Sequence, residues 1–376
     1  MRYCLLFLIA LAAAGDDRWI EAQSGPFQVL SNAGEKPARE TLNLLEQVRY
    51  AVGTSLGKDD LKTVWPVRVV VGKMAPVVPA LRRDAYVGAL AANAPVPPEW
   101  LREVVRLWLE ANAGRMPPGI EAGILSFYST ATAVGTRVTL GAPPPAGKRN
   151  LDWARIHLLV TDPNYAGRIR VMLYNLQHGA EMEPACRNAF GKPAAEIERQ
   201  AAASLAAGKF ETVTSGGKPL NPERDFLVRT AAEPLGPLAL ADLKQTHEAY
   251  RALVPAAPAA AHEGMGFAAL NAKQEGGARA EFTLATEAGS TSARAWFEAA
   301  RLEPDATKAR ALLQKSAELN QAWAEPYVLL AKLETDPSRK LEWLKRAAAL
   351  DPRDAAKWRA VAELYQTHNK FAEAFK

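Results

Sequence analysis

The last third of the chain repeats itself, and this periodicity constrains the fold more than any other feature of the sequence. A large residue recurs at separations of 34, 31 and 31 residues, at His262, Trp296, Tyr327 and Trp358. Four residues after each comes a small one, at Gly266, Ala300, Ala331 and Ala362. Periods of this length indicate stacked helical hairpins. The two helices of a hairpin can cross closely only where one of them presents Gly or Ala.

The spacing within one period identifies the type of repeat. Ala278, Phe282 and Ala285 follow His262 by 16, 20 and 23 residues. A large residue, a small residue at the helix crossing and a later Ala, aromatic, Ala set resemble the tetratricopeptide repeat (TPR). We therefore expect an all-α domain over residues 262–376, with about three and a half units and an incomplete last one.

The resemblance to this repeat implies a binding surface for a protein partner. In the repeat fold, the first helix of each unit lines the concave face. Six positions on these helices form the predicted site, namely Arg294, Phe297, Arg301, Lys332, Arg359 and Gln366. So many cations on one face would suit an acidic segment or a free carboxylate of the partner. A solvated charged face with no ligand is the alternative.

The region before the repeats alternates between strand and helix patterns. Two short strands around a Ser-Gly-Pro turn begin it, a helix is predicted over 36–56, and β-branched residues predict a strand at 67–72. Residues 73–97 have no clear pattern, and the chain then reads as helical at 98–113 and again from 119. We expect an α+β domain over 16–232, and a helical linker with an Ala/Pro hinge over 233–261.

A short segment of this domain has the layout of a metallopeptidase site. Residues 102–106 read Arg-Glu-Val-Val-Arg, and "GRMPPGIEAGILSFYS" follows at 114–129. These segments, with others over most of residues 17–230, resemble bacterial peptidase-like proteins that join a gluzincin domain to TPRs. In zincins, His-Glu-x-x-His places two imidazoles on one helix face beside a general base. In gluzincins, a Glu on the next helix is the third ligand.

The resemblance assigns these roles to residues that cannot perform them. Arg102 and Arg106 fall on the histidine positions, Ala122 falls on the third ligand, and only Glu103 matches the catalytic glutamate. A guanidinium stays protonated and has no lone pair for a metal. The resemblance therefore implies a degenerate domain with no metal and no cofactor, in which an arginine-carboxylate cluster fills the former metal space.

Two other hypotheses remain open at this point. The protein is an active hydrolase if other residues, or a metal bound elsewhere, replace the lost site. It is a plain scaffold if its first domain has no peptidase ancestry. The five histidines never occur in pairs at ligand spacing, and Cys186 lies in an Ala-rich context typical of a buried small residue.

The N-terminus indicates where the protein works. Residues 1–15 combine one Arg, an apolar run and small residues before Gly15, the layout of a secretory signal peptide. We expect an exported protein, periplasmic or secreted, with no membrane span in the mature chain because the run is shorter than the roughly 20 residues that a span needs. The net charge of +5 is mild and its cations are dispersed, so nucleic acid is not an expected partner.

Overall fold

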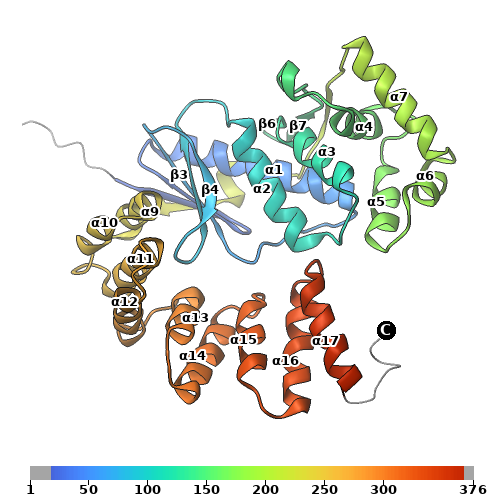
Figure 1. Ribbon diagram of the computed structural model, residues 1–376. Coiled ribbons are helices and arrows are strands. Elements are labelled where there is room, and N and C mark those ends of the chain that lie inside the picture. Colours follow the sequence, from blue (N-terminus) through green and yellow to red (C-terminus); the bar gives the residue numbers. More distant parts are fainter. Residues whose placement is uncertain (1–17, 368–376) are drawn as a thin grey trace, which may run out of the picture.

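The computed structural model describes residues 18–367, which form a mixed sheet covered by helices, followed by a row of helical hairpins (Figure 1). The predicted signal peptide at residues 1–15 and the end of the last repeat lie outside the described residues. This architecture confirms an α+β region followed by an all-α repeat region. No helix among the described residues is long and apolar enough to cross a membrane.

The main sheet has six strands in the order β4-β5-β3-β2-β1-β9. The strands β2, β3 and β5 are parallel to one another, whereas β1, β4 and β9 each pair antiparallel with their neighbour. Their bounds are β1 Ile20–Ser24, β2 Phe27–Ser31, β3 Val67–Gly72, β4 Val77–Leu81, β5 Tyr86–Ala91 and β9 Leu227–Thr230.

The central strand β3 is buried at every position, which explains its nearly continuous valine run. Because side chains alternate between the two faces of a strand, Val69 and Val71 point into the large core, whereas Val70 points to the other face. On that second face lies α9 (Leu235–Lys244). The sheet is therefore a middle layer, with α1 (Glu35–Leu56) packed against β1 and β2 in the large core.

Further helices and a second, three-stranded sheet complete the N-terminal domain. The small sheet has the order β6-β7-β8 and contacts α1. Its strands are β6 Thr132–Val134, β7 Arg137–Leu140 and β8 Val213–Gly216. The helices are α2 Pro98–Asn112, α3 Pro118–Tyr128, α4 Leu151–Thr161, α5 Ile169–Gln177, α6 Met182–Phe190, α7 Ala194–Ala207 and the short α8 Pro222–Asp225, with a single 3-10 turn η1 at Ala146–Lys148.

The segment between the two regions, predicted as a helical linker with a hinge over 233–261, contains two helices. The chain forms α9 and then α10 (His247–Arg251), because Gln245 adopts the left-handed conformation and Thr246 caps the second helix. The first repeat helix already begins at Pro258, a residue suited to the first position of a helix. Residues 258–261 of the expected hinge are therefore helical.

The repeat region consists of antiparallel helix pairs. The seven helices are α11 Pro258–Asn271, α12 Glu275–Glu287, α13 Ala293–Arg301, α14 Ala306–Leu319, α15 Glu325–Leu333, α16 Pro337–Leu350 and α17 Ala355–Thr367. The four large residues of the repeat lie on α11, α13, α15 and α17, the first three of which each begin a helix pair. A Cβ on Gly266 would lie 2.7 Å from the ring of Phe282, so the predicted small residue is indeed required at this crossing.

Candidate functional site

The helix α2 carries the positions that the resemblance assigns to a zinc motif. Arg102 is exposed to solvent. The guanidinium of Arg106 donates from Nε to Glu103 Oε2 at 2.9 Å and also pairs with Glu110. The hydrogen bond with Glu103 is the main cause of the raised pKa of Arg106. The one residue that matches a catalytic base is therefore held by a permanent cation.

The next helix, α3, supplies no donor at the third position. Ala122 is half-buried and ends in a methyl group. The preceding Glu121 pairs with Arg353 of the repeats, Oε2 to Nη2, at 2.5 Å. Gly123 is explained by packing, since a Cβ there would lie 2.3 Å from the carbonyl oxygen of Asp152 on α4. Within residues 18–367, no group of three or more His, Cys, Asp or Glu side chains is arranged to hold a metal ion.

The six residues predicted on the concave face have different surroundings. Arg294 donates to the carbonyl of Arg82 in the N-terminal domain, and its guanidinium lies 4.4 Å from the ring centre of Phe267. Burial lowers the pKa of Arg294. This arginine therefore has a role within the chain, at the junction of the two regions.

The other five lie farther along the repeats. Phe297 packs on Trp323, with ring centres 4.7 Å apart, and Arg301 pairs with Glu298 at 2.6 Å. Three are exposed and, in the described part of the chain, have no ion-pair partner or side-chain hydrogen bond: Lys332, Arg359 and Gln366. Arg301, Lys332 and Arg359 thus remain the accessible cations of the predicted surface.

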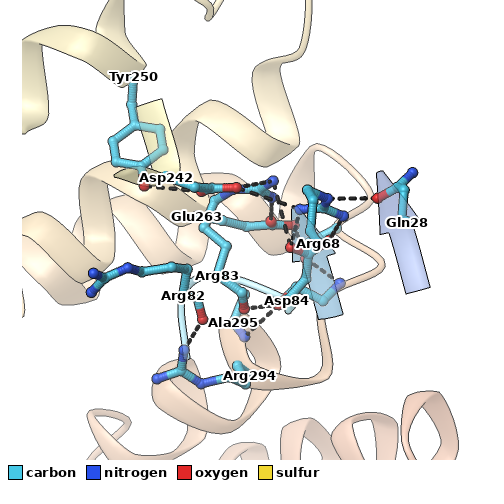
Figure 2. A network of polar contacts seen from close by, with 12 residues as sticks. Gln28, Arg68, Arg82, Arg83, Asp84, Asp242, Tyr250, Glu263, Arg294 and Ala295 are labelled. Carbon is cyan, nitrogen blue, oxygen red and sulfur yellow. Dashed lines mark hydrogen bonds and ion pairs between the residues drawn. The ribbon is translucent and has the colours of Figure 1, made fainter. Parts of the chain in front are cut away.

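A buried network of charges joins the sheet to the repeats (Figure 2). Its centre is Arg83, in the turn between β4 and β5. The Arg83 guanidinium contacts Asp242 on α9, Nε to Oδ1, at 2.9 Å, and Glu263 on α11, Nη1 to Oε2, at 2.5 Å. Arg68 on β3 binds Asp84 at 2.9 Å and approaches Asp242. Four structural elements, β3, the β4-β5 turn, α9 and α11, therefore meet in one ionic cluster.

The electrostatics of this cluster follow from its burial. Burial by itself would raise the pKa of Asp84, but the charges of Arg83 and Arg68 outweigh it and hold that pKa well below its usual range. For Glu263 burial dominates, and its pKa is raised although Arg83 opposes the shift. Burying a charge away from water is unfavourable unless the charge is paired and hydrogen-bonded. Each of these carboxylates therefore needs an arginine to stay ionised in the interior.

Neutral groups complete the network. The Tyr250 hydroxyl donates to Asp242 Oδ1 at 3.0 Å, and the Ser290 hydroxyl donates to Glu263 Oε1 at 2.6 Å. The Ser292 hydroxyl donates to the carbonyl of Arg83 at 3.0 Å. Sequence reasoning missed this network. The available signal was a lone acid within small apolar residues, as in "ALADL" around Asp242 and "AHEGMG" around Glu263, because a buried acid needs a cation.

The turns between successive repeats make the remaining contacts with the N-terminal domain. Asn320, between α14 and α15, donates to the carbonyl of Val64 at 3.0 Å, and Trp323 meets Trp65 with ring centres 5.0 Å apart. At the turn between α16 and α17, Arg353 binds Glu121 as described above. Between the domain and these turns lies a cleft of about 870 Å³, which α2 lines with Leu107, Glu110 and Ala111.

Comparisons with known proteins found similarity to solved structures. No protein-family model matches the chain, and no curated protein sequence matches it. The chain is similar to the solved structure of MamA, with 17% identity over 34% of this chain and 80% of that one and a TM-score of 0.31.

Two other solved structures are similar. YrrB, a TPR protein with an unusual peptide-binding site, matches with 16% identity over 38% of this chain and 81% of its own, with a TM-score of 0.32. The Cut9-Hcn1 hetero-tetramer of the APC/C matches with 14% identity over 57% and 45%, with a TM-score of 0.27. On the residue offsets and helix pairs described above, the C-terminal region of this chain is a helical repeat region.

Proposed function

We propose that this is an exported, non-catalytic protein in which a degenerate gluzincin-like domain supports TPR-type repeats that bind a protein partner. The observation that carries the proposal is the chemistry at the four motif positions. Arg102 and Arg106 cannot donate a lone pair to a metal, Ala122 has no donor, and Glu103 is held by Arg106. Water cannot be activated at a site without the three ligands that a catalytic zinc needs.

The non-catalytic part of the proposal is tested by metal content and hydrolysis. We expect elemental analysis of the purified full chain to find no stoichiometric zinc. We also expect any casein hydrolysis by the preparation to be equal in the wild type and in Glu103→Gln. Stoichiometric zinc, together with hydrolysis that disappears in Glu103→Gln, would show that the domain is an active peptidase.

The partner is proposed to bind the repeats through the accessible cations. Arg301 and Lys332 lie on the first helices of successive repeats, and both are exposed. Solvent-exposed ion pairs contribute about 0.2–1 kcal/mol each, so reversing two such charges should weaken binding by several-fold or more. An acidic segment of the partner is the chemistry that this surface would recognise.

The partner is tested with immobilised full chains that capture proteins from an envelope extract. Mass spectrometry quantifies the captured proteins. The Arg301→Glu/Lys332→Glu chain should lose proteins that the wild type recovers. Arg137→Glu is the matched control, because Arg137 is an exposed arginine on β7 of the other region. Equal recovery by all three chains would rule out this surface.

Export is a separate part of the proposal, supported by the layout of residues 1–15. A chain that lacks residues 2–15 should stay in the cytoplasm of the producing cell, whereas the full chain should appear outside it with these residues removed. Cell fractionation and N-terminal sequencing provide the measurement, and a full chain found intact in the cytoplasm would contradict export.

A further inference from the structure

The cleft between the N-terminal domain and the repeat turns has the size of a ligand site. Its volume of about 870 Å³ lies within the roughly 300–1,000 Å³ typical of small-molecule pockets. Its walls come from two regions of the chain, which are held together beside it by the Asn320 to Val64 hydrogen bond and the Arg353 to Glu121 ion pair. Neither wall includes the accessible cations of the proposed partner surface.

The wall contributed by the N-terminal domain carries unbalanced positive charge. Lys62 and Arg115 both line the cleft and are exposed, and neither has a carboxylate partner within residues 18–367. Arg115 uses only its Nε, which donates to the carbonyl of Arg353 at 3.0 Å. The acid on this wall, Glu110, already pairs with Arg106. Because Arg106 also pairs with Glu103, this wall keeps a net positive charge of about one, and Lys62 and Arg115 are its cations without a carboxylate partner.

The wall contributed by the repeats carries unbalanced negative charge. Three carboxylates line it, at Glu325, Asp351 and Asp354. All three contact one ammonium group, Lys357 Nζ, at 3.0, 2.9 and 2.9 Å. One cation cannot neutralise three acids, so about two negative charges remain. Among the described residues that line this wall, the one other ionised group is Arg353, which pairs with Glu121.

Between the charged walls lies an aromatic surface. Trp65 and Trp323 both line the cleft, and Trp65 is only 5% exposed. Two buried polar atoms on lining residues have no hydrogen-bond partner among the described residues, Thr63 Oγ1 and Arg353 Nη1. Buried polar groups are normally paired, so these two atoms are exceptions among the residues that line the cleft.

We propose that this cleft binds a short peptide whose two ends are both free. The peptide carboxylate would face Lys62 and Arg115, and its ammonium group would face Glu325, Asp351 and Asp354. An apolar side chain would lie on the tryptophans. A ligand of a single charge would be repelled by one wall, and an uncharged sugar would leave the charges of both walls uncompensated.

Titration calorimetry of the full chain with defined peptides tests the proposal. The probes are Ala-Phe, Ala-Phe-Ala and Ala-Phe-Ala-Ala, each with free ends, N-acetylated and C-amidated. We expect saturable binding of at least one free peptide, weakened tenfold or more by either cap. If no free peptide binds, or if capped and free peptides bind equally, the two charged walls only hold the domain and the repeats together, and the proposal is wrong.

Variants assign each end of the peptide to its wall. Arg115→Glu should weaken binding of the free peptide tenfold or more and leave binding of the amidated peptide unchanged. Glu325→Gln should weaken binding of the free peptide and leave binding of the acetylated peptide unchanged. Ala322→Trp, on an exposed lining residue, should abolish binding by filling the cleft without a change of charge. Unaltered peptide binding in Ala322→Trp, with an unchanged melting temperature, would place the ligand elsewhere and overturn the proposal.

The proposed partner surface provides the matched control. Arg301→Glu/Lys332→Glu should bind the peptides as the wild type does, because neither residue lines the cleft. Arg115→Glu should still recover the protein partner. A loss of peptide binding in the Arg301→Glu/Lys332→Glu chain would show that the peptides bind the repeats instead of the cleft, which would overturn this inference and leave the partner surface in place.

Discussion

At the scale of single residues, the contact between domain and repeats depends on Arg83. Its guanidinium is buried between the carboxylates of Asp242 and Glu263, and a third acid, Asp84, lies 3.7 Å away. Pairing of this kind does little more than offset the desolvation of the charges. Loss of Arg83, however, leaves Glu263 buried without a counter-charge and leaves Asp242 with only the longer contact to Arg68. Removing Arg83 should therefore destabilise the fold by more than the net stabilisation that its ion pairs provide.

We expect Arg83→Met to lower the free energy of unfolding by about 3–5 kcal/mol, because Glu263 would remain buried without a cation and Asp242 would keep only the 3.4 Å contact with Arg68. Urea denaturation followed by circular dichroism measures the effect. Arg187→Met is the control, since Arg187 pairs with Glu183 on an exposed helix face and should leave the transition unchanged. Equal transitions for the two variants would mean that the Arg83 cluster does not stabilise the fold.

Only the acidic residues of this cluster have a recognisable signal in the sequence. A lone acid within a run of small apolar residues indicates a buried carboxylate, and both Asp242 and Glu263 have that context. The cation could not be assigned, because Arg83 is separated from Asp242 by 159 residues and from Glu263 by 180. Many other arginines were available to either acid. Only the pairing of β4 with β5 places this turn beside α9 and α11.

At the scale of elements, the close crossing of α3 and α4 explains the "GIEAG" segment without reference to metal chemistry. The backbone of α4 at Asp152 leaves no room for a side chain on Gly123, and the nearest side chain, Ile156, would lie 2.7 Å from a Cβ there. A glycine at this position is therefore required by packing. It would be required in any protein with this helix pair, with or without a peptidase site.

We expect Gly123→Ala to destabilise the N-terminal domain by about 1–3 kcal/mol, as overpacking of a buried contact usually does. Gly276→Ala is the comparison, because the space around Gly276 on α12 is open and alanine is the better helix former there. Thermal melting of the two variants gives the answer. A Gly123→Ala chain as stable as the wild type would mean that α3 and α4 separate at little cost.

Sequence patterns predicted the elements whose signals are local. The strand at 67–72 and the helices beginning at Glu35 and Pro98 are confirmed within a residue or two. The strands β4 and β5 were missed. Pro79 removes a hydrogen-bond donor from β4, and the register shifts between Val77 and Ala80, so the edge strand has no clean alternation. Its identity comes from pairing with β5, which is not a local property.

At the scale of the whole molecule, the repeats lie against the N-terminal domain with one edge, formed by the turns between successive repeats (Figure 1). Ser292, Asn320 and Arg353 each belong to such a turn, and each bonds to the N-terminal domain. The regular period of the repeats brings the turns to that edge. The sequence predicted the period, but not the docking, because its contacts join residues such as Glu121 and Arg353 that are 232 positions apart.

This arrangement predicts that the α16-α17 turn can separate from the N-terminal domain while the contacts of the Arg83 cluster stay intact. Glu121→Lys places a cation against Arg353, so like charges should separate the α16-α17 turn from α3. Hydrogen exchange measured by mass spectrometry should then lose protection at residues 350–356, while residues 82–84 and 290–292 keep theirs, because the Arg83 cluster is untouched. Glu181→Lys, on an exposed residue of the N-terminal domain, controls for the charge change. Unchanged exchange at 350–356 would mean that Trp65, Trp323 and Asn320 suffice to hold this end, whereas loss of protection at both places would mean that the two contacts form one cooperative unit.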